Sequence, residues 1–569
     1  MRKLINSTII LITALSLSSC YDDIKEADLV FINGNVKTVD SNLPEAEAVA
    51  VNSDTISFVG SSEDVRGRIG EKTQVVDLKG RLLIPGFIES HAHLRGIGKS
   101  QIELNLKSAA SWDEVVFMVS EAAYKIKPGD WIIGRGWHQE KFDPEPNPNI
   151  EGYPLHNDLS EATKMNPVIL NHASGHAIFA NKKAMELAGI SNSTKDPAGG
   201  RIVRDTEGNP IGVLEETAKF LVTNLYKKDL EKRTSEEIKS QIEKEIILGI
   251  DECVSKGITS FHDAGSTFED IDVIKGLVDQ KKNDLRLYLM IGENNDSLKS
   301  RIKDYRFDGY GDGTLTVRSI KRYIDGALGS RGAWMLEEYS DLPGHFGQKV
   351  NTLAYLEETA RIAIENGFQI CTHAIGDRGN REILNVYEKV ITEYGLNQDL
   401  RWRVEHAQHL TDEDIPRFAE LGVIPAMQGV HCTSDAVFVP QRIGYDRAEE
   451  GAYVWRKLLE AGAIVCNGTD APVEDVSPIQ NYYSTVTRKL DDGSTFFPEQ
   501  AMTRMEALRS ATIYSAYAAF EENIKGSITK GKLADMVVLS NDILTVPSAE
   551  IKSTEILYTV IDGKIVYQK

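Results

Sequence analysis

The middle of the chain alternates short apolar segments with longer amphipathic segments from about residue 83 to residue 467. The short segments are rich in Ile, Val and Leu, as expected for strands that are buried on both faces. Such alternation predicts βα units and a parallel sheet. A closed (β/α)8 barrel takes about 250 residues, so a chain of 569 residues can hold one together with additions. The predicted strands are 83–88, 168–171, 258–262, 286–291, 320–324, 369–372, 402–405, 423–427 and 464–467.

These nine segments are one more than an eight-stranded barrel needs. The surplus is 168–171, because it lies in a long stretch, about 100–250, that follows the first predicted barrel strand. We therefore predict an insertion there. Its aromatic residues and its Pro-rich loop make it a candidate lid over a substrate.

Both ends of the chain carry short β-like segments with Gly and Asn at the turns between them, as in hairpins. We predict one small β-sandwich domain that is built from residues 28–81 and 522–569. The barrel domain, residues 82–521, is then inserted between its two halves. The β-like segments are 28–34, 48–51, 55–60 and 75–80 at one end and 534–539, 556–563 and 564–567 at the other.

The N-terminus has the pattern of a targeting segment. Arg2 and Lys3 precede an apolar run, residues 9–17, that is too short to span a membrane as a mature helix. The targeting segment ends in Leu17-Ser18-Ser19-Cys20, which resembles a bacterial lipoprotein signal. We expect residues 1–19 to be a signal peptide, Cys20 to be lipidated and residues 20–27 to be a tether, with the protein anchored in the cell envelope. The alternative is a plain secretory signal with a chance cysteine.

Charge and cysteine content exclude several classes of function. The formal net charge is −21, and it becomes −23 once Arg2 and Lys3 are removed with the signal peptide. Such an acidic protein is not expected to bind nucleic acid or to bind an anionic membrane electrostatically. The five cysteines form no C-x-x-C pair, so no disulfide framework is predicted.

Histidines stand at the end of the first predicted barrel strand. His91 and His93 are two residues apart, so both imidazoles leave a strand on the same side. Two converging neutral imidazoles suit a borderline metal such as zinc. The alternative is a pair of surface histidines that follow a strand.

Later strands end in groups that complete such a site. Lys321, His373, His406 and Asp470 lie at the ends of predicted strands four, five, six and eight. Barrel chemistry concentrates at the carboxyl ends of the strands. Zinc lowers the pKa of bound water to about 7, which makes hydroxide available, and Asp470 would be the base that accepts the proton. Lys321 would become an anionic oxygen ligand if CO2 carboxylated it, or it would instead pair with Asp325.

Several motifs together resemble the amidohydrolase-3 group of the amidohydrolase superfamily, which includes YtcJ-like and N-substituted formamide deformylase-like proteins. The resemblance runs from about residue 28 to the C-terminus. It implies a distorted TIM barrel with a small β-sandwich, one or two divalent metals that are usually zinc, and hydrolysis of non-peptide C–N bonds. The motifs are Pro85-Gly-Phe-Ile-Glu-Ser-His-Ala-His93, Gly175-His-Ala-Ile-Phe-Ala-Asn181, Gly212-Val-Leu-Glu-Glu-Thr-Ala218, Lys321 with Asp325-Gly326, His373-Ala-Ile-Gly-Asp-Arg378, Glu405-His-Ala-Gln408 and Gly468-Thr-Asp-Ala-Pro-Val473.

The resemblance assigns roles position by position. It implies that the metal ligands are His91, His93, Lys321, His373, His406 and Asp470. Glu216 is an alternative ligand and His176 a candidate substrate contact. Asp377 and Arg378 would bind a polar end of the substrate or pair with each other. Glu89 departs from the Asp that relatives often have, which favours a supporting role. His138, His172, His262 and His431 are expected to be lining, capping or surface residues.

These features predict a metal-dependent amidohydrolase that cleaves an amide-like or formamide-like bond with metal-activated hydroxide. The same scaffold also hosts hydrolysis of esters or lactones, deamination and isomerisation, and the metal set alone does not separate these reactions. A non-catalytic, lipid-anchored binding protein is a further alternative, but it would be expected to lack a ligand or the base. The expected partner is a small-molecule substrate, and a dimer is the oligomeric state to test.

Overall fold

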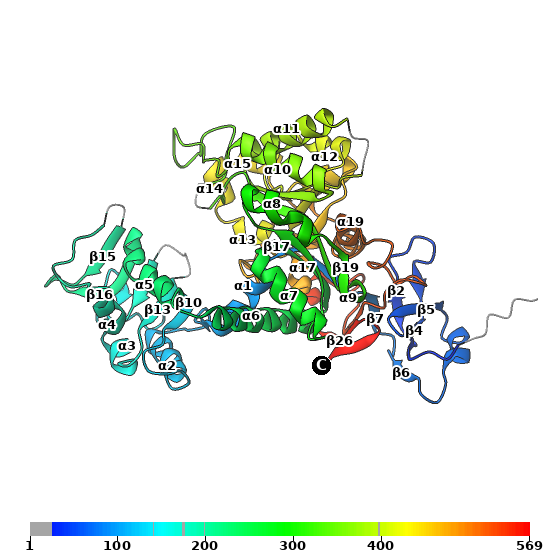
Figure 1. Ribbon diagram of the computed structural model, residues 1–569, viewed down its shortest axis with the longest axis horizontal. Coiled ribbons are helices and arrows are strands. Elements are labelled where there is room, and N and C mark those ends of the chain that lie inside the picture. Colours follow the sequence, from blue (N-terminus) through cyan, green and yellow to red (C-terminus); the bar gives the residue numbers. More distant parts are fainter. Residues whose placement is uncertain (1–24, 140–141, 173–176, 198–199, 330, 396–398) are drawn as a thin grey trace, which may run out of the picture.

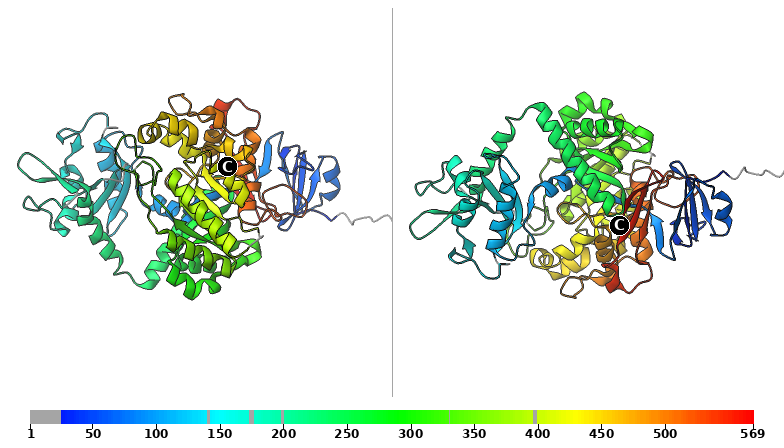
Figure 2. Two further views of the ribbon diagram at one scale, coloured as in Figure 1. Left: turned by 90° about the horizontal axis from the view of Figure 1, so that it is seen from above. Right: turned by 90° about the horizontal axis from the view of Figure 1, so that it is seen from below.

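The computed structural model describes residues 25–139, 142–172, 177–197, 200–329, 331–395 and 399–569. A central barrel lies between a β-sandwich and a lobe formed by the insertion, residues 103–234, which we call the insertion lobe (Figure 1). The three parts remain distinct in the perpendicular views of Figure 2. No described helix combines the length and the apolar character that crossing a membrane requires.

Eight parallel strands form the barrel, and they neighbour one another in chain order. The circle closes next to the last strand, where the Asp470 N–H donates to His91 O and the His93 N–H donates to Ala471 O, both at 2.8 Å. This confirms the predicted barrel. Its strands are β8 (Phe87–Ala92), β17 (Ile258–Ser266), β18 (Arg286–Ile291), β20 (Leu315–Tyr323), β21 (Gln369–Ala374), β22 (Arg403–His406), β23 (Ile424–Gln428) and β24 (Cys466–Gly468).

Helices cover the outside of the barrel (Figure 2). Their buried apolar side chains belong to the same core cluster as those of the barrel strands. Side-chain caps set several of their starts: Thr267 caps α7 and Thr352 caps α10, while Gly367 with φ 71° ends α10. The main helices are α6 (Ser235–Ser255), α7 (Phe268–Asp279), α8 (Asn295–Arg301), α10 (Leu353–Asn366), α11 (Asp377–Glu393), α12 (Ile415–Leu421), α13 (Gly429–Asp435), α14 (Val439–Ile443), α15 (Tyr445–Gly451), α16 (Trp455–Glu460), α17 (Pro478–Thr487), α18 (Arg504–Ser510) and α19 (Ile513–Ala518).

The β-sandwich draws strands from both ends of the chain, as predicted. One sheet has the order β5-β4-β1-β6 and the other β27-β26-β25-β7-β2-β3. Their facing side chains share one core, which includes Phe31, Val49, Leu83 and Met536. The strands are β1 (Leu29–Ile32), β2 (Asn35–Lys37), β3 (Glu45–Ala46), β4 (Ala48–Asn52), β5 (Thr55–Gly60), β6 (Gln74–Asp77), β7 (Leu82–Pro85), β25 (Met536–Leu539), β26 (Ile556–Ile561) and β27 (Lys564–Gln568).

The predicted strand 83–88 is two strands in the structure. Strand β7 pairs with β25 in the sandwich, and β8 begins the barrel after Gly86. A Cβ on Gly86 would lie 2.1 Å from Thr259 Oγ1, so only glycine allows this close crossing. Alternate residues of β7 face different cores: Leu83 faces the sandwich core, whereas Leu82 and Ile84 face the barrel.

The insertion lobe has its own sheet, in the order β15-β16-β14-β13-β10-β9. Strand β13 is the predicted surplus strand, and it is outside the barrel, as expected. The sheet is buried on both faces: Leu170 packs with Trp112 on one side, and Ile169 packs with Met185 on the other. This explains its near-continuous apolar sequence. The elements are β9 (Leu104–Asn105), α2 (Trp112–Ala123), β10 (Ile132–Trp137), α3 (Asn157–Ala162), β13 (Val168–His172), β14 (Ala177–Ala180), α4 (Lys182–Leu187), β15 (Gly200–Arg204), β16 (Pro210–Glu216) and α5 (Phe220–Leu230).

Two helices join the insertion lobe to the barrel. Helix α1 (Leu94–Ile102) leads into the lobe and α6 leads out of it, and their backbones touch at glycines. A Cβ on Gly98 would lie 1.6 Å from Glu245 O, and a Cβ on Gly249 would lie 2.4 Å from Leu94 O. The lobe is therefore attached through a tightly packed helix pair.

The Gly98→Ala variant tests this contact. The added methyl meets the backbone of α6, which cannot rotate away, so the helices must separate. We expect the free energy of unfolding to fall by about 1–3 kcal/mol or more, which thermal unfolding would detect. The control is Gly276→Ala in α7, where the nearest atom lies 4.0 Å away and helix propensity favours Ala by up to about 1 kcal/mol. Equal midpoints for the two variants would contradict the packing argument.

Candidate metal centre and active site

One cavity of about 370 Å³ opens at the carboxyl ends of the barrel strands. The six residues predicted as metal ligands all line it, although they come from five strands and span almost 380 residues of sequence. Parallel strands bring their carboxyl ends together, so the fold explains this convergence. The six are His91, His93, Lys321, His373, His406 and Asp470.

Asp470 lies at the centre of the cluster. Its Oδ1 is 3.2 Å from His93 Nε2 and 3.7 Å from His91 Nε2, and its Oδ2 is 3.8 Å from His431 Nε2. Burial tends to raise the pKa of Asp470, but the surrounding histidines hold it well below its ordinary value. The carboxylate is therefore ionised at neutral pH and is available to bind a cation or a proton.

His373 and His406 form the opposite side of the cluster. Their ring centroids are 4.5 Å apart, and His406 lies 4.8 Å from His91. Burial, followed by nearby Lys321, lowers the pKa of His91 to about 4 and that of His373 to about 3. Burial also holds the pKa of His406 well below its usual value. All three rings are thus neutral, which is the form that binds metals.

An unusual backbone conformation turns His406 into the cavity. Consecutive residues of a regular strand point to opposite faces, yet Glu405 and His406 both approach His91. His406 achieves this with φ 75°, and Asp470 has φ 59°. Such left-handed conformations cost a non-glycine residue about 1–3 kcal/mol each and cluster at functional sites. The fold thus places two of the six residues at the expense of local strain.

A buried ion pair orients His91. The carboxylate of Glu405 contacts His91 Nδ1, which directs Nε2 toward the cavity. Arg403 holds that carboxylate with two hydrogen bonds, 2.7 Å from Nε and 2.9 Å from Nη2. Burial alone would raise the pKa of Glu405, but Arg403 and His91 lower it far below its ordinary value. Glu405 belongs to one of the sequence motifs, but neither it nor Arg403 was assigned a role, although their i, i+2 spacing on β22 was a usable signal.

Other contacts orient the remaining ligands. His406 Nδ1 lies 2.8 Å from Gln428 Oε1, which leaves Nε2 facing the cavity. Glu89 does not face the metal cluster: it accepts hydrogen bonds from the His91 N–H at 3.0 Å and from the Thr469 N–H and hydroxyl at 2.8–3.1 Å. Glu89 therefore connects β8 to the loop that carries Asp470. This is the supporting role that was expected from a Glu in place of the Asp of relatives.

Lys321 is buried beside the histidines. Its Nζ lies 3.3 Å from His91 Nε2, and within the described part of the chain it makes no ion pair. The alternative pairing with Asp325 is not present. Asp325 instead accepts the N–H groups of Trp334, Ile375 and Gly376 at 2.8–3.0 Å.

The donor set fits a borderline divalent metal. Among the described side chains, His431 Nε2 and Asp470 Oδ1 are buried without a hydrogen-bond partner, and both residues line the cavity. His373 Nε2 also has no hydrogen-bond partner, but it lies 3.6 Å from Asp325 Oδ1. Two groups, His91–His93–Asp470 and His406–His431–Asp470, each place three donor atoms within 4.8 Å of one another. Neutral imidazole nitrogens with a carboxylate oxygen are the ligands that zinc prefers. His431, expected only to line, cap or lie on the surface, belongs to the second group.

The other predicted residues lie elsewhere. Asp377 accepts the Leu336 and Arg378 N–H groups, each at 2.7 Å, and Arg378 Nη2 donates to Leu336 O at 3.2 Å. Both thus hold the loop that follows β20, and neither lines the catalytic cavity. Glu216 ends β16 in the insertion lobe, but its side chain is outside the described structure, so its role as a ligand stays a prediction. His176 and Cys20 are outside the described residues, so their roles stay predictions, as does the lipid anchor.

Comparison with known proteins decides the family. Residues 74–567 match the sequence model of the amidohydrolase family. The chain belongs to this family. The residues that line the cavity and form its donor set all lie within the matched segment.

Individual relatives cover nearly the whole chain. Protein LONG AFTER FAR-RED 3 from Arabidopsis thaliana is 33% identical over 95% of this chain and 92% of its own length. The putative amidohydrolase YtcJ from Bacillus subtilis is 31% identical (95% and 99%), and the N-substituted formamide deformylase from Arthrobacter pascens is 28% identical (95% and 98%). A solved metal-dependent hydrolase from Pyrococcus horikoshii shares the fold, with a TM-score of 0.73, 23% identity and coverage of 92% and 99%.

Proposed function

We propose that this amidohydrolase hydrolyses a non-peptide C–N bond of a small amide-like or formamide-like substrate with one or two bound zinc ions. The observation that carries the proposal is Asp470, whose carboxylate lies 3.2–3.8 Å from three imidazole nitrogens at the wall of one cavity. A relative that is 28% identical over 95% of this chain is named an N-substituted formamide deformylase, which supports the type of bond.

His91, His93, His373, His406 and Asp470 would hold the metal, and Lys321 would join them as a carboxylated ligand. Bound zinc supplies two kinds of chemistry: it acidifies a coordinated water and polarises a carbonyl group. The support for carboxylation is the surroundings of Lys321. Unmodified, it would be a buried amine that pairs with no carboxylate among the described residues, next to the residues that would bind a metal cation. Carboxylation would turn it into an oxygen ligand with negative charge.

A single residue of the chain, Asp470, would carry out both proton transfers. Asp470 takes a proton from the attacking water and delivers it to the leaving nitrogen, which must be protonated to depart as an amine. Its low pKa keeps it ionised before the reaction. His431 Nε2, 3.8 Å from Asp470 Oδ2, is placed to steady the carboxylate during the transfer.

The volume of the cavity limits the size of the substrate. At about 370 Å³ it holds a small molecule, and beyond the donor set its wall includes the apolar side chains of Leu328, Phe438 and Val473. These surfaces favour a substrate with a compact apolar group near the scissile bond.

Removal and return of the metal tests the proposal. Full-length protein stripped with a chelator should lose hydrolysis of N-formyl and N-acetyl amines, and added zinc should restore it. Zinc should also raise the midpoint of thermal unfolding, since a ligand at 100 times its Kd stabilises the native state by about 2.7 kcal/mol. Intact-mass analysis under native conditions should show one added CO2 that Lys321→Ala removes. A protein that binds zinc yet cleaves no amide would contradict the proposal, and so would one that binds no zinc.

A further inference from the structure

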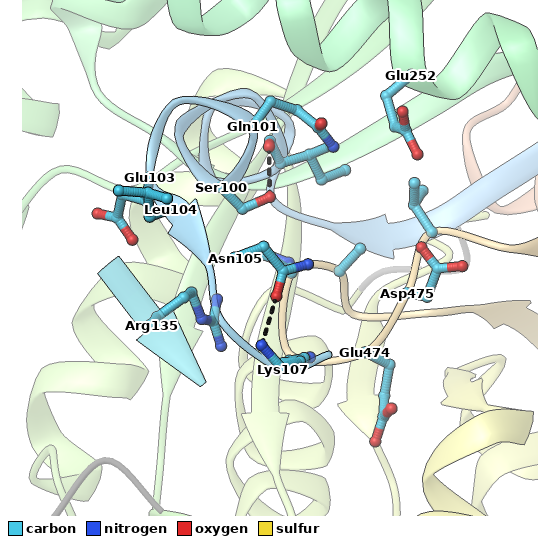
Figure 3. Close-up of a pocket in the computed structure, with 14 residues that line it drawn as sticks. Ser100, Gln101, Glu103, Leu104, Asn105, Lys107, Arg135, Glu252, Glu474 and Asp475 are labelled. Atoms are coloured by element: carbon cyan, nitrogen blue, oxygen red, sulfur yellow. Dashed lines mark hydrogen bonds between the residues drawn. The ribbon is translucent and has the colours of Figure 1, made fainter. Parts of the chain in front are cut away.

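A second cavity lies between the insertion lobe and the barrel. It has a volume of about 550 Å³, and its walls come from α1, β9, β10, α6 and the loop after Asp470 (Figure 3). Glu474 lines both this cleft and the catalytic cavity. The cleft is therefore adjacent to the site at which we propose that the bond is cleaved.

Three of the four carboxylates that line the cleft contact a lysine. Asp475 and Glu252 both form an ion pair with Lys256, at 2.6 and 2.9 Å, so the two carboxylates share one lysine. Glu103 faces Lys99 at 3.8 Å. Within the described residues, Glu474 is the carboxylate of this cleft that makes no ion pair.

Two cations on the lobe side have no such partner. Arg135 on β10 and Lys107 after β9 line the cleft, and neither side chain makes an ion pair or a hydrogen bond within the described chain. Strands β9 and β10 are paired, with Arg135 opposite Asn105, which brings the two cations to the same wall. Figure 3 shows both on the lobe side, across from Glu474 and Asp475.

The local backbone makes room for this pair. Gly136 has φ 96°, and a Cβ at this position would lie 2.5 Å from Lys107 Cγ. The glycine thus lets the Lys107 stem lie beside the residue that follows Arg135. Neighbouring like charges repel each other, and an anion placed between them would relieve the repulsion. A guanidinium also presents paired donors that match a carboxylate.

We propose that the substrate carries a carboxylate remote from the scissile amide, and that Arg135 and Lys107 bind it in this cleft. The inference rests on the proposed function and specifies its substrate class: amides whose amine or acyl half ends in a carboxylate. Glu474, at the junction of the two cavities, would accept an N–H group of the intervening chain and repel a carboxylate that stops short of the cations.

Matched substrate pairs test the inference on the zinc-loaded, full-length enzyme. The probes are N-formyl ω-amino acids of increasing length, each paired with its neutral primary carboxamide. The wild-type enzyme should prefer the carboxylate, by kcat/KM, once the chain is long enough to reach the cleft. Arg135→Gln should reduce that preference roughly 10-fold, because hydrogen bonds to charged groups are worth that much. Arg135→Gln with Lys107→Gln should abolish it, and added salt should weaken the wild-type preference.

Control variants and a charge reversal sharpen the outcome. Lys125→Gln and Arg233→Gln remove exposed charges of the insertion lobe that do not line the cleft, and they should keep the wild-type preference. Arg135→Glu should instead favour N-formyl diamines. An unchanged preference in the Arg135 and Lys107 variants would overturn the inference. An equal loss on both members of each pair would also overturn it, since the cations would then act by closing the lobe onto Glu474.

A binding measurement separates this inference from the proposed function. Calorimetry with the same carboxylate and carboxamide pairs requires no turnover. Carboxylate-selective binding that depends on Arg135, without hydrolysis, would support carboxylate binding in the cleft and refute amide cleavage. Hydrolysis without carboxylate selectivity would support amide cleavage and refute carboxylate binding in the cleft.

Discussion

Asp470→Asn is expected to lower kcat roughly 1,000-fold, the effect typical of removing a general acid–base residue. The amide has nearly the same shape as the carboxylate but cannot accept the proton of the attacking water. It also cannot return that proton to the leaving nitrogen. The contacts of Asp470 with His91 and His93 show that the carboxylate faces the donor cluster, where such a transfer would take place. Steady-state kinetics on the best N-formyl substrate would measure the effect.

Two further measurements make this result specific. Zinc content by elemental analysis should remain at half or more of the wild-type level, because four histidines and Lys321 remain. Asp446→Asn makes the same chemical change at an exposed position of α15 and should leave kcat unaltered. If Asp470→Asn binds zinc and retains wild-type kcat, then Asp470 is not the base.

Arg403→Met should lower the free energy of unfolding by about 3–5 kcal/mol, the cost of leaving one member of a buried ion pair alone. Arg403 and Glu405 are both fully buried, and their two hydrogen bonds measure 2.7 and 2.9 Å. The variant should also bind zinc about 10–100-fold more weakly, because Glu405 would no longer be held against His91 Nδ1. Thermal unfolding of the zinc-free protein and a competition assay with a zinc chelator would measure the two effects separately.

A matched control and a double variant distinguish charge from orientation. Arg201 also makes paired hydrogen bonds to Glu151 and Glu215, but it is exposed, so Arg201→Met should cost no more than about 1 kcal/mol. Arg403→Met with Glu405→Leu removes both buried charges and should recover most of the stability. It should not recover zinc affinity, since His91 Nδ1 then has no acceptor. Wild-type stability in the single Arg403 variant would contradict the buried-pair account.

The barrel was predictable from local patterns. Strands that are buried on both faces have continuous apolar sequences, so the positions of β17, β18, β20 and β21 followed from segments such as 258–262 and 369–372. Pro85-Gly86 indicated the hand-over from the β domain to the first barrel strand, but β7 and β8 are one apolar run in sequence and were predicted as a single strand, 83–88. Only their partners, β25 and β17, assign them to different sheets.

The six predicted ligands met at one cavity for a general reason. Each follows or ends a parallel strand, and all such ends face the same mouth of a barrel. The roles of Glu405, Gln428 and His431 did not follow from this rule. Glu405 and His91 are 314 residues apart, and nothing local to either residue records their contact. His431 lies on α13, a helix beyond β23, so a rule based on strand ends excluded it.

The sequence by itself therefore determined the order of the barrel strands and the chemistry of their ends, because strand burial and side-chain alternation are local properties of the chain. The tertiary structure alone decided which groups orient those ends. It showed that Arg403 and Glu405 fix His91, that Glu89 ties β8 to the Asp470 loop, and that the insertion lobe turns Arg135 and Lys107 toward the barrel. These contacts join residues that are far apart in the chain, and their geometry depends on how whole sheets and helices pack.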